Sequence, residues 1–521
     1  LISKLGDSMS DEDHSSFGED DDNNDGVAWK EIVGMALNGP STDLPIPTNY
    51  TSGQRASLML LATTLLTSVR EGLTTPKARK LVRNSENAEA GLCLGLWREL
   101  MHVQTSSMRA RSNVMVAADI EDETSKIRPY EEQFWMAAPT AIQECLAILQ
   151  KLLPVPHFLA SVTAILKDDD VYEDGSVRRR ALRLLGDRAA EVKPNSPESC
   201  LFLETIPDLT DLFTVTQDEQ NENAHRLKVV TQQAALIAIE RLAQSLCFAS
   251  GIKDGMSKRK AQVFLPTLKK VCELLNHASK QYEKACKQNK PNLLEGQLLS
   301  SAALCSAALV TVLKTRCLAF LPPLIPSLVT SLATVNQWQK QPASVDGMDT
   351  SESNVSDQDL IETSKLLQRS ILRTILAIAE VLPQFLCSYL GSILSASVLP
   401  SKTLRWENDE IVINLAERLH QTLATKTPAR QLVPVIIKTV TKCFEKDEMW
   451  EEGKAIMEVF DESIRSSSRA DLVPVMNKCL NAILLAYSYA GFQEGRFELL
   501  TVANKSLLSL VLKISEAQLR P

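Results

Sequence analysis

The sequence predicts an all-α fold in which antiparallel helix pairs stack into a superhelical array, an α-solenoid. Three observations support this prediction. Apolar residues recur at i, i+3, i+4 and i+7, the spacing of amphipathic helices. A Leu-Pro or Val-Pro step followed by an apolar helix returns several times, and such self-similarity is typical of solenoids. Finally, hydrophobic residues make up 44% of the 521 residues but aromatic residues only 5%, which favours many aliphatic helix seams over one aromatic core.

The clearest repeat lies at 153–191. Its first helix opens at Leu153-Pro154, and proline suits a first helical turn because its missing N–H would be unpaired there. An acidic connector leads to a second helix with a regular apolar face. A Leu-Pro helix, a connector with Asp, and Val-Arg-x-x-Ala-x-x-x-Leu form the HEAT pattern. Its structural residues here are Pro154, Asp174, Val177, Arg178, Ala181, Leu184 and Leu185.

The other copies are degenerate, as is usual where each repeat packs only on its neighbours. The Pro-containing first helices are predicted at 206–213, 264–275, 321–333, 382–394, 432–444 and 472–485. Their partner helices are predicted at 297–314, 366–382, 410–424 and 454–464. Two polar stretches interrupt them. We expect 279–292 to be a basic extension or loop and about 336–358 to be a disordered insertion, because loops tolerate insertions better than the stacked core does.

The N-terminal part differs in composition. Residues 1–26 contain nine acids and one lysine, which accounts for the whole net charge of −8. With so little apolar content, this segment is predicted to be disordered, whereas residues 27–125 form a helical region that the pattern places poorly. The degenerate HEAT repeats are expected over 126–425, and a further helical segment over 426–521. Because residue 1 is Leu and the last apolar helix has no polar outer face, we expect a piece of a longer protein.

No catalytic or metal-binding pattern is found. Phosphate-binding glycine loops, Gly-x-Ser-x-Gly and His-Glu-x-x-His are missing from the sequence, although each has a recognisable spacing. None of the 11 cysteines forms Cys-x-x-Cys, so buried thiols in a reducing compartment are expected. The apolar run from Leu298 to Leu313 is too short for a bilayer. The sequence therefore predicts a protein that is not an enzyme and has no cofactor, no small-molecule substrate and no membrane partner. The weakest alternative is an enzyme within residues 84–125.

Two basic clusters are candidate contact sites. The arginines at 178–188 are expected to pair with the acidic connector of a neighbouring repeat. The cluster at 253–290 has ten Lys or Arg against three acids, so it is either a solvated face or a contact for RNA phosphates or an acidic protein. Its only aromatic residues are Phe264 and Tyr282, which argues against base-specific reading and against DNA sequence recognition. The candidate contact residues are Lys253, Lys258, Arg259, Lys260, Lys269, Lys270, Lys284 and Lys287.

Several segments together resemble one family. The runs 154–188, 320–329, 382–394 and 505–521 are similar to the HEAT repeat-containing protein 1 family, from about residue 130 onward. The resemblance implies a nucleolar scaffold in the U3 small nucleolar ribonucleoprotein, or small-subunit processome, that supports pre-18S ribosomal RNA processing and transcription by RNA polymerase I. It also implies that 426–521 begins the family's C-terminal helical domain, truncated here. The expected partners are processome proteins, pre-rRNA and U3 RNA.

Another HEAT-type scaffold, such as a nuclear transport receptor, is the main alternative. Armadillo-type cargo carriers bind basic peptides through Trp-x-x-x-Asn ladders. None of the six tryptophans is followed by Asn at that spacing, which favours the nucleolar scaffold.

Overall fold

A computed structural model describes the chain mainly from residue 140 onward. The described residues are 67, 71–72, 74–76, 140–148, 150–151, 153–167, 176–193, 196–213, 222–247, 258–288, 291–341, 357–400, 405–445, 449–491 and 496–518. Every regular element within these ranges is a helix, so the predicted all-α fold is confirmed. The acidic segment 1–26 and nearly all of 27–125 lie outside the described residues.

The chain divides into two compact units, Leu1–Thr205 and Ile206–Pro521. The first contains α7 (Val155–Lys167) and α8 (Ser176–Glu191), which pack on each other, while α9 (Pro197–Asp211) crosses the boundary. These are the two helices predicted for 153–191. On α8 the predicted apolar face is buried, with Val177, Ala181, Leu184 and Leu185 each no more than 4% exposed. Asp174 of the connector lies outside the described residues.

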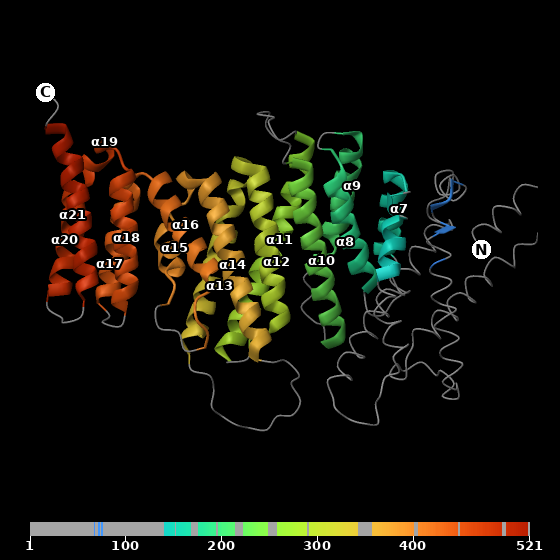
Figure 1. Ribbon diagram of the computed structural model, residues 1–521, viewed down its shortest axis with the longest axis horizontal. Coiled ribbons are helices and arrows are strands. Elements are labelled where there is room, and N and C mark those ends of the chain that lie inside the picture. The colour runs from blue at the N-terminus through green and yellow to red at the C-terminus, as the bar shows by residue number, and fades with distance from the viewer. Residues whose placement is uncertain are drawn as a thin grey trace, which may run out of the picture. The chain divides into compact units, whose positions relative to one another are not determined.

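The second unit continues the same helix-pair pattern (Figure 1). Its helices are α10 (Glu222–Cys247), α11 (Lys258–Lys287), α12 (Leu293–Leu313), α13 (Leu321–Lys340), α14 (Asp357–Val381), α15 (Leu390–Ser397), α16 (Glu410–Lys426), α17 (Ala429–Phe444), α18 (Trp450–Ser466), α19 (Arg469–Leu472), α20 (Met476–Gly491) and α21 (Phe497–Gln518). Short 3-10 turns, η2 (Lys314–Phe320), η3 (Pro383–Phe385) and η5 (Val473–Val475), join some of them.

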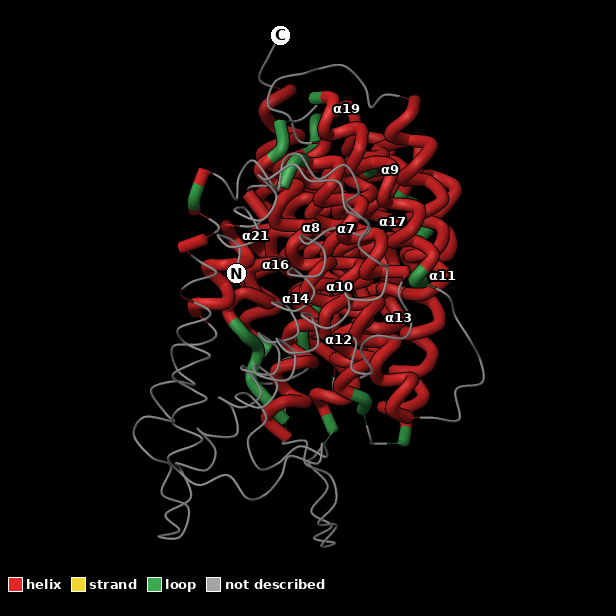
Figure 2. Tube along the Cα trace, turned by 90° about the vertical axis from the view of Figure 1, so that its right-hand side faces the viewer, coloured by secondary structure: helices red, strands yellow, loops and turns green. Residues whose placement is uncertain are grey.

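These helices form two layers. The first-helix layer consists of α11, α13, α15, α17 and α20, and each of them contacts the next. The second-helix layer consists of α10, α12, α14, α16, α18 and α21, which are in contact in the same way. Contacts between α11 and α12, α13 and α14, α15 and α16, α17 and α18, and α20 and α21 join the layers into pairs. Figure 2 shows the two layers on opposite sides of this unit. The arrangement is an α-solenoid of HEAT-type helix pairs.

The recurring prolines do not all start helices, and this part of the sequence interpretation is wrong. Pro322 lies in the first turn of α13, as expected, but Pro266 and Pro434 lie inside α11 and α17. These two helices begin at Lys258 and Ala429, upstream of the predicted starts. An interior proline removes one backbone hydrogen bond and displaces a carbonyl, which a helix tolerates by bending. The proline therefore marks the repeat but not its first residue.

The two predicted insertions are also partly helical. Residues 279–287 are the last turns of α11, so the basic stretch is a helical extension, and a loop follows only near Asn292, which caps α12. Likewise 336–340 belong to α13 and 357–358 to α14, whereas 342–356 lie outside the described residues. Trp338 and Gln339 are buried. The polar composition of this stretch was misleading because its amides are bonded inside the core.

One stretch, Leu293–Lys340, is long and apolar enough to cross a membrane by length and composition, and half of its apolar window is buried. It comprises α12, η2 and α13. Because α12 lies between α10 and α14 and also packs on α11, its apolar residues on several sides are in contact with other helices. The burial is that of a core helix in a two-layer stack.

The last helix pair exposes large apolar side chains. Leu480 and Leu484 of α20 are 37% and 62% exposed, and Leu508 and Leu512 of α21 are each 59% exposed. In each helix the two leucines are four residues apart, so they lie on one face. This agrees with the expected lack of a polar outer face at the last apolar helix.

Candidate interaction surface

The outward side chains of the two layers differ in charge. On α11, α13, α15 and α17 the only exposed acid among the described side chains is Glu273, and Glu283 of α11 is one third exposed. The exposed bases of these helices are Arg259, Lys269, Lys270, Lys280, Lys284, Lys287, Lys340, Arg430, Lys438 and Lys442. We call this set the basic face; within it, Lys340 pairs with the buried Glu452 of α18 at 2.8 Å. Because its bases far outnumber its exposed acids, it is the main candidate site.

Most of the predicted contact residues belong to this face. Lys269, Lys270, Lys284 and Lys287 are exposed on α11. They recur with Lys280 on one side of the helix, since the intervening Val271, Leu274 and Leu275 are buried. Lys258 starts α11, but its side chain is outside the described set, and Lys253 lies outside the described residues.

Three of the α11 lysines form no ion pair with the described part of the chain. Among the described residues no acidic side chain lies within ion-pair distance of Lys269, Lys280 or Lys284. Lys270 and Lys287 pair with acids one turn away on α11, at 3.7 Å from Glu273 and 2.8 Å from Glu283. Exposed pairs of this kind contribute only about 0.3–0.5 kcal/mol. They would therefore compete weakly with an anionic ligand.

Lys260 has a structural contact that the sequence did not reveal. Its Nζ donates to the backbone carbonyl of Leu246 at 2.7 Å, near the C-terminal end of α10. The last carbonyls of a helix have no partner within it, and the helix dipole favours a cation there. Lys260 thus joins α11 to α10 and is not a free member of the basic face.

We expect Lys260→Gln to lower the free energy of unfolding by about 1 kcal/mol, because the charged bond to the Leu246 carbonyl is lost. Thermal melting followed by circular dichroism measures this change. Lys269→Gln is the matched control, because the same substitution at an exposed position with no ion pair should leave the melting temperature unchanged. Equal melting of the two variants would show that the Leu246 contact does not stabilise the fold.

Three bases of the basic face were missed from the sequence. Arg430, Lys438 and Lys442 lie on α17 and share the exposed side of that helix. They are more than 140 residues from the α11 lysines, and no local charge cluster marks them. They join the same face because α11 and α17 belong to one layer. In the sequence, only the alternation of first and second helices along the chain could have indicated that α11 and α17 share one face.

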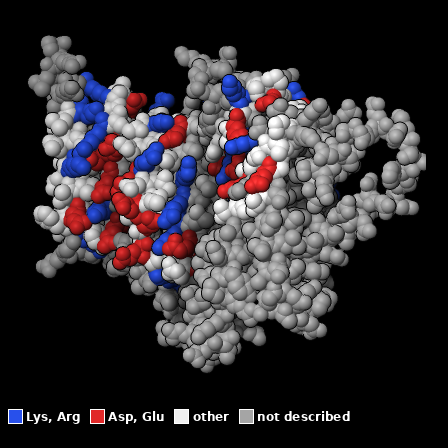
Figure 3. Space-filling view, turned by 45° about the vertical axis from the view of Figure 1, so that its right-hand side comes forward, with Lys and Arg blue, Asp and Glu red and all other residues white. Residues whose placement is uncertain are grey.

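The second-helix layer carries mixed charge on its outward side. Exposed acids, among them Glu362, Glu380 and Glu417, lie with exposed bases such as Arg373 and Arg418. Figure 3 shows this side of the molecule, where acidic and basic side chains are interspersed. An anionic partner would therefore meet repulsion here that it does not meet on the basic face.

Part of this mixed charge stabilises the stack. Three times, an acid at the start of one second-layer helix pairs with a base on the preceding helix of that layer. The pairs are His225–Glu295 at 3.3 Å, Arg369–Asp409, and Lys454–Glu498 at 2.5 Å. An acid in a first turn also suits the helix dipole, so these pairs favour one order and register of neighbouring repeats.

Glu295 is the most buried acid of these pairs, with its side chain 7% exposed. Burial raises the pKa of its carboxyl group, and the nearby His225 opposes that shift. Its second oxygen, Oε2, has no hydrogen-bond partner among the described groups. A raised carboxyl pKa in a cleft can indicate a catalytic acid. Here His225 and His277 are the titratable neighbours that oppose the shift, and the bond to His225 makes the group part of the contact between α10 and α12.

A buried amide network holds α13 to α14 and to the segment before α16. Gln339 Nε2 donates to the Trp406 carbonyl at 2.9 Å and to Asn408 at 3.0 Å. Gln368 of α14 donates to Asn336 at 2.9 Å and to Gln339 at 3.1 Å. Since buried amides are costly unless bonded, this network fixes the local packing and is not a ligand site.

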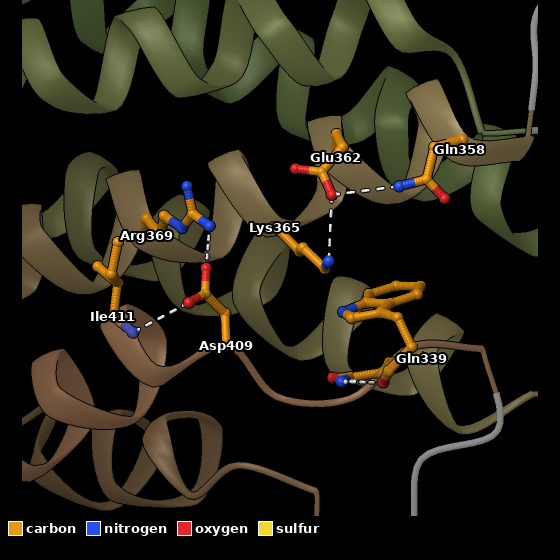
Figure 4. A network of polar contacts seen from close by, with 8 residues as sticks. Gln339, Gln358, Glu362, Lys365, Arg369, Asp409 and Ile411 are labelled. Atoms are coloured by element: carbon orange, nitrogen blue, oxygen red, sulfur yellow. Dashed lines mark hydrogen bonds and ion pairs between the residues drawn. The ribbon is translucent and has the colours of Figure 1, made fainter.

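Nearby, Arg369 on α14 points to Asp409, whose other oxygen accepts the N–H of Ile411 at 3.0 Å and caps α16 (Figure 4). One residue thus serves as both helix cap and ion-pair partner.

The arginine cluster at 178–188 is partly tied down within the first unit. Arg180 donates to Gln143, and Arg188 pairs with Glu191 at 2.9 Å. Arg178 is half-buried on α8. The acidic connector with which Arg178 was expected to pair lies outside the described residues. We therefore interpret these arginines as contacts that hold the helices of the first unit together, and not as part of the candidate surface.

His420 makes the stability of the second unit depend on pH. Its ring on α16 lies 2.8 Å from the Ser397 hydroxyl of α15, and burial lowers the pKa of the ring to about 4. The folded state therefore binds this proton less readily than the unfolded chain, whose histidine titrates near 6.5. The neutral ring contributes stability above pH 6.5, and this contribution is lost as pH falls from 6.5 toward 4.

We expect the wild-type chain to lose about 2 kcal/mol more stability than His420→Gln between pH 7 and pH 4, at about 1.4 kcal/mol per pKa unit with a discount for the partial exposure of the ring. The amide of Gln can keep the bond to Ser397 but does not titrate. Urea unfolding at several pH values measures the difference. Parallel pH profiles of the two proteins would contradict the assignment.

Within the described ranges, no group of three or more His, Cys, Asp or Glu side chains is arranged to hold a metal ion. The described cysteines are free thiols, most of them buried. Burial raises the pKa of Cys272 to about 12 and that of Cys286 to about 11. Such thiols stay protonated and are poor nucleophiles; they act as small apolar core residues.

Comparison with known proteins agrees with the helix-pair pattern. The chain is 25% identical over 415 residues to human "HEAT repeat-containing protein 1" and 24% identical over 421 residues to the Danio rerio protein of that name, each match covering 78% of this chain. The Dictyostelium discoideum homolog is 22% identical over 306 residues, which cover 59% of this chain and 11% of the homolog. This chain is a relative of HEAT repeat-containing protein 1. The resemblance predicted from the sequence is thereby confirmed.

The chain spans only 16% of the length of the human and Danio rerio relatives. No family model matches it. Among solved structures, one chain of the Kap95:Nup1 complex is similar with a TM-score of 0.36 and 10% identity, covering 99% of this chain and 54% of that one. A chain of the SYS-1/POP-1 complex has a TM-score of 0.35 and 10% identity, covering 98% and 84%.

Proposed function

We propose that this chain is part of a non-catalytic nucleolar scaffold of the small-subunit processome, needed for pre-18S rRNA processing and supporting transcription by RNA polymerase I. The observation that carries the proposal is the similarity to HEAT repeat-containing protein 1 over most of the chain. The function implied by that family is a scaffold within the U3 small nucleolar ribonucleoprotein. Its partners would be processome proteins, pre-rRNA and U3 RNA.

The architecture is consistent with such a role. A two-layer stack of helix pairs offers a long surface on which several partners can bind side by side. The titratable groups with strongly shifted pKa values, such as His420 and Cys272, are explained by burial in helix contacts. A scaffold needs this kind of rigid, surface-rich fold and no nucleophile or base.

Depletion of the full-length protein that contains this chain tests the proposal. We expect unprocessed pre-18S precursors to accumulate, while precursors of the large subunit change less. A tagged copy should concentrate in nucleoli and recover U3 RNA on purification. Normal small-subunit rRNA maturation together with a block in the nuclear import of a cargo would replace the proposal with the transport-receptor alternative.

A further inference from the structure

We propose that the basic face, centred on the α11 lysines, binds the phosphate backbone of base-paired RNA without reading its sequence. This inference deepens the proposed function and rests on it for the choice of RNA as the partner. The charge, spacing and surroundings of the exposed side chains in the second unit support a contact with a nucleic-acid backbone.

The first step is the length of the lysine row. From Lys269 to Lys287 the row follows eighteen residue steps of α11, which correspond to about 27 Å at 1.5 Å per residue. Lys280 and Lys284 lie one turn apart within it. A row of this length on a rigid element can meet several phosphates of a duplex at once, because duplex charges follow each other at intervals of a few ångströms.

The second step is the availability of these charges. Lys269, Lys280 and Lys284 form no ion pair with any acid in the described part of the chain. Lys270 and Lys287 have only exposed partners on the same helix, with side chains 50% and 73% exposed. Lysines in this state remain hydrated and surrounded by counterions, and the release of those ions drives binding to a nucleic-acid backbone.

The third step is the neutral surface beside the row. The outward residues of α13 and α15 include Thr330, Gln337, Ser392 and Ser395 and no exposed acid. Hydroxyl and amide groups are regular partners of phosphate and sugar oxygens. On α17 the row is followed by further bases at Arg430, Lys438 and Lys442. A backbone crossing from α11 toward α17 would meet few acids among the described side chains: Glu273 and Glu283 of α11, each paired with a lysine, and Glu445 just after α17.

The fourth step distinguishes paired from single-stranded RNA. Single strands are held mainly by stacking of their bases on aromatic rings. The two aromatic residues of α11, Phe264 and Tyr282, are buried at 0% and 1% exposure. Among the described first-layer helices and turns, Phe385 is the one exposed aromatic residue, at 42%. Duplex RNA is recognised by shape and backbone, which requires no such rings.

The test compares two variants that each remove three positive charges from the 521-residue chain. Lys269→Gln/Lys280→Gln/Lys284→Gln alters the basic face, and Arg226→Gln/Arg373→Gln/Arg418→Gln alters exposed bases of the second-helix layer. Fluorescence anisotropy over a salt series measures binding to a labelled 20-base-pair RNA duplex of mixed sequence. A second RNA duplex of different sequence, a DNA duplex of the same length, a 20-nucleotide uridine strand and poly-L-glutamate serve as comparison probes.

We expect the α11 variant to bind the RNA duplex about ten-fold more weakly at low salt. Its slope of log affinity against log salt should be shallower by two to three units, about 0.9 for each lost phosphate contact. The control variant should bind like the parent, both variants should melt like the parent, and the two RNA duplexes should bind equally.

Four outcomes would overturn the inference: an unchanged salt slope in the α11 variant, equal loss in both variants, tighter binding of the DNA duplex or the uridine strand, or tighter binding of poly-L-glutamate per charge. The last would make the face a site for acidic proteins. Normal duplex binding with undisturbed pre-18S maturation on depletion would refute the proposed function alone, whereas absent binding with disturbed maturation would refute only the RNA contact.

Discussion

Leu184→Asp is expected to unfold the α7–α8 pair. Leu184 is 4% exposed on the face of α8 that also buries Val177, Ala181 and Leu185. A carboxylate at this position would lose its hydration without gaining an arranged ionic partner, which costs about 3–5 kcal/mol. Hydrogen exchange measured by mass spectrometry should show loss of amide protection across 155–191, together with reduced helical circular dichroism.

Ala190→Asp is the matched control for this prediction, since Ala190 is exposed on the same helix. A new carboxylate there should change stability by no more than about 0.5 kcal/mol. If Leu184→Asp kept full amide protection over 155–191, the assignment of these helices as a HEAT-type pair would be wrong.

Gly453→Ala is expected to destabilise the α17–α18 pair by about 2–3 kcal/mol, the range of overpacking in a tight core. A Cβ atom on Gly453 would lie 2.5 Å from Phe444 Cε1 and 3.4 Å from Cys443 Cβ. The Phe444 ring cannot easily move away, because it stacks on Tyr489 with centroids 4.3 Å apart. Urea unfolding of the variant measures the effect.

Gly491→Ala supplies the control, because a Cβ there meets no atom within 4 Å. That substitution should leave stability unchanged or raise it slightly. Removing the ring should relieve the clash, so Gly453→Ala should cost less in a Phe444→Ala background than in the parent. Additive effects of the two substitutions would show that Phe444 is not what limits the space at Gly453.

The sequence by itself determined the helix class and the pairing of helices. Apolar spacing is a local property, and a helix must bury its apolar stripe on a similar neighbour. For this reason the face formed by Val177, Ala181, Leu184 and Leu185 could be predicted residue by residue, and it is buried. The α11 lysines could also be predicted as a candidate surface, because their charge is concentrated in one stretch of chain.

Only the tertiary structure decided which polar residues lie inside. Gln339 was assigned to a disordered insertion because its neighbours are polar, yet it is fully buried and bonded to the Trp406 carbonyl, 67 residues away. Lys260 is a candidate contact residue in the sequence, but its side chain binds the end of α10. A local pattern cannot distinguish a hydrated polar group from one whose partner comes from a distant repeat.

The extent of the basic face was likewise decided by the stack. Arg430, Lys438 and Lys442 join the α11 lysines because first helices of successive repeats align in one layer. Neither segment shows this by itself, since each helix carries its charges on its own outward side. Packing of the apolar faces turns these sides in the same direction, and that packing is what unites separate charges into one surface.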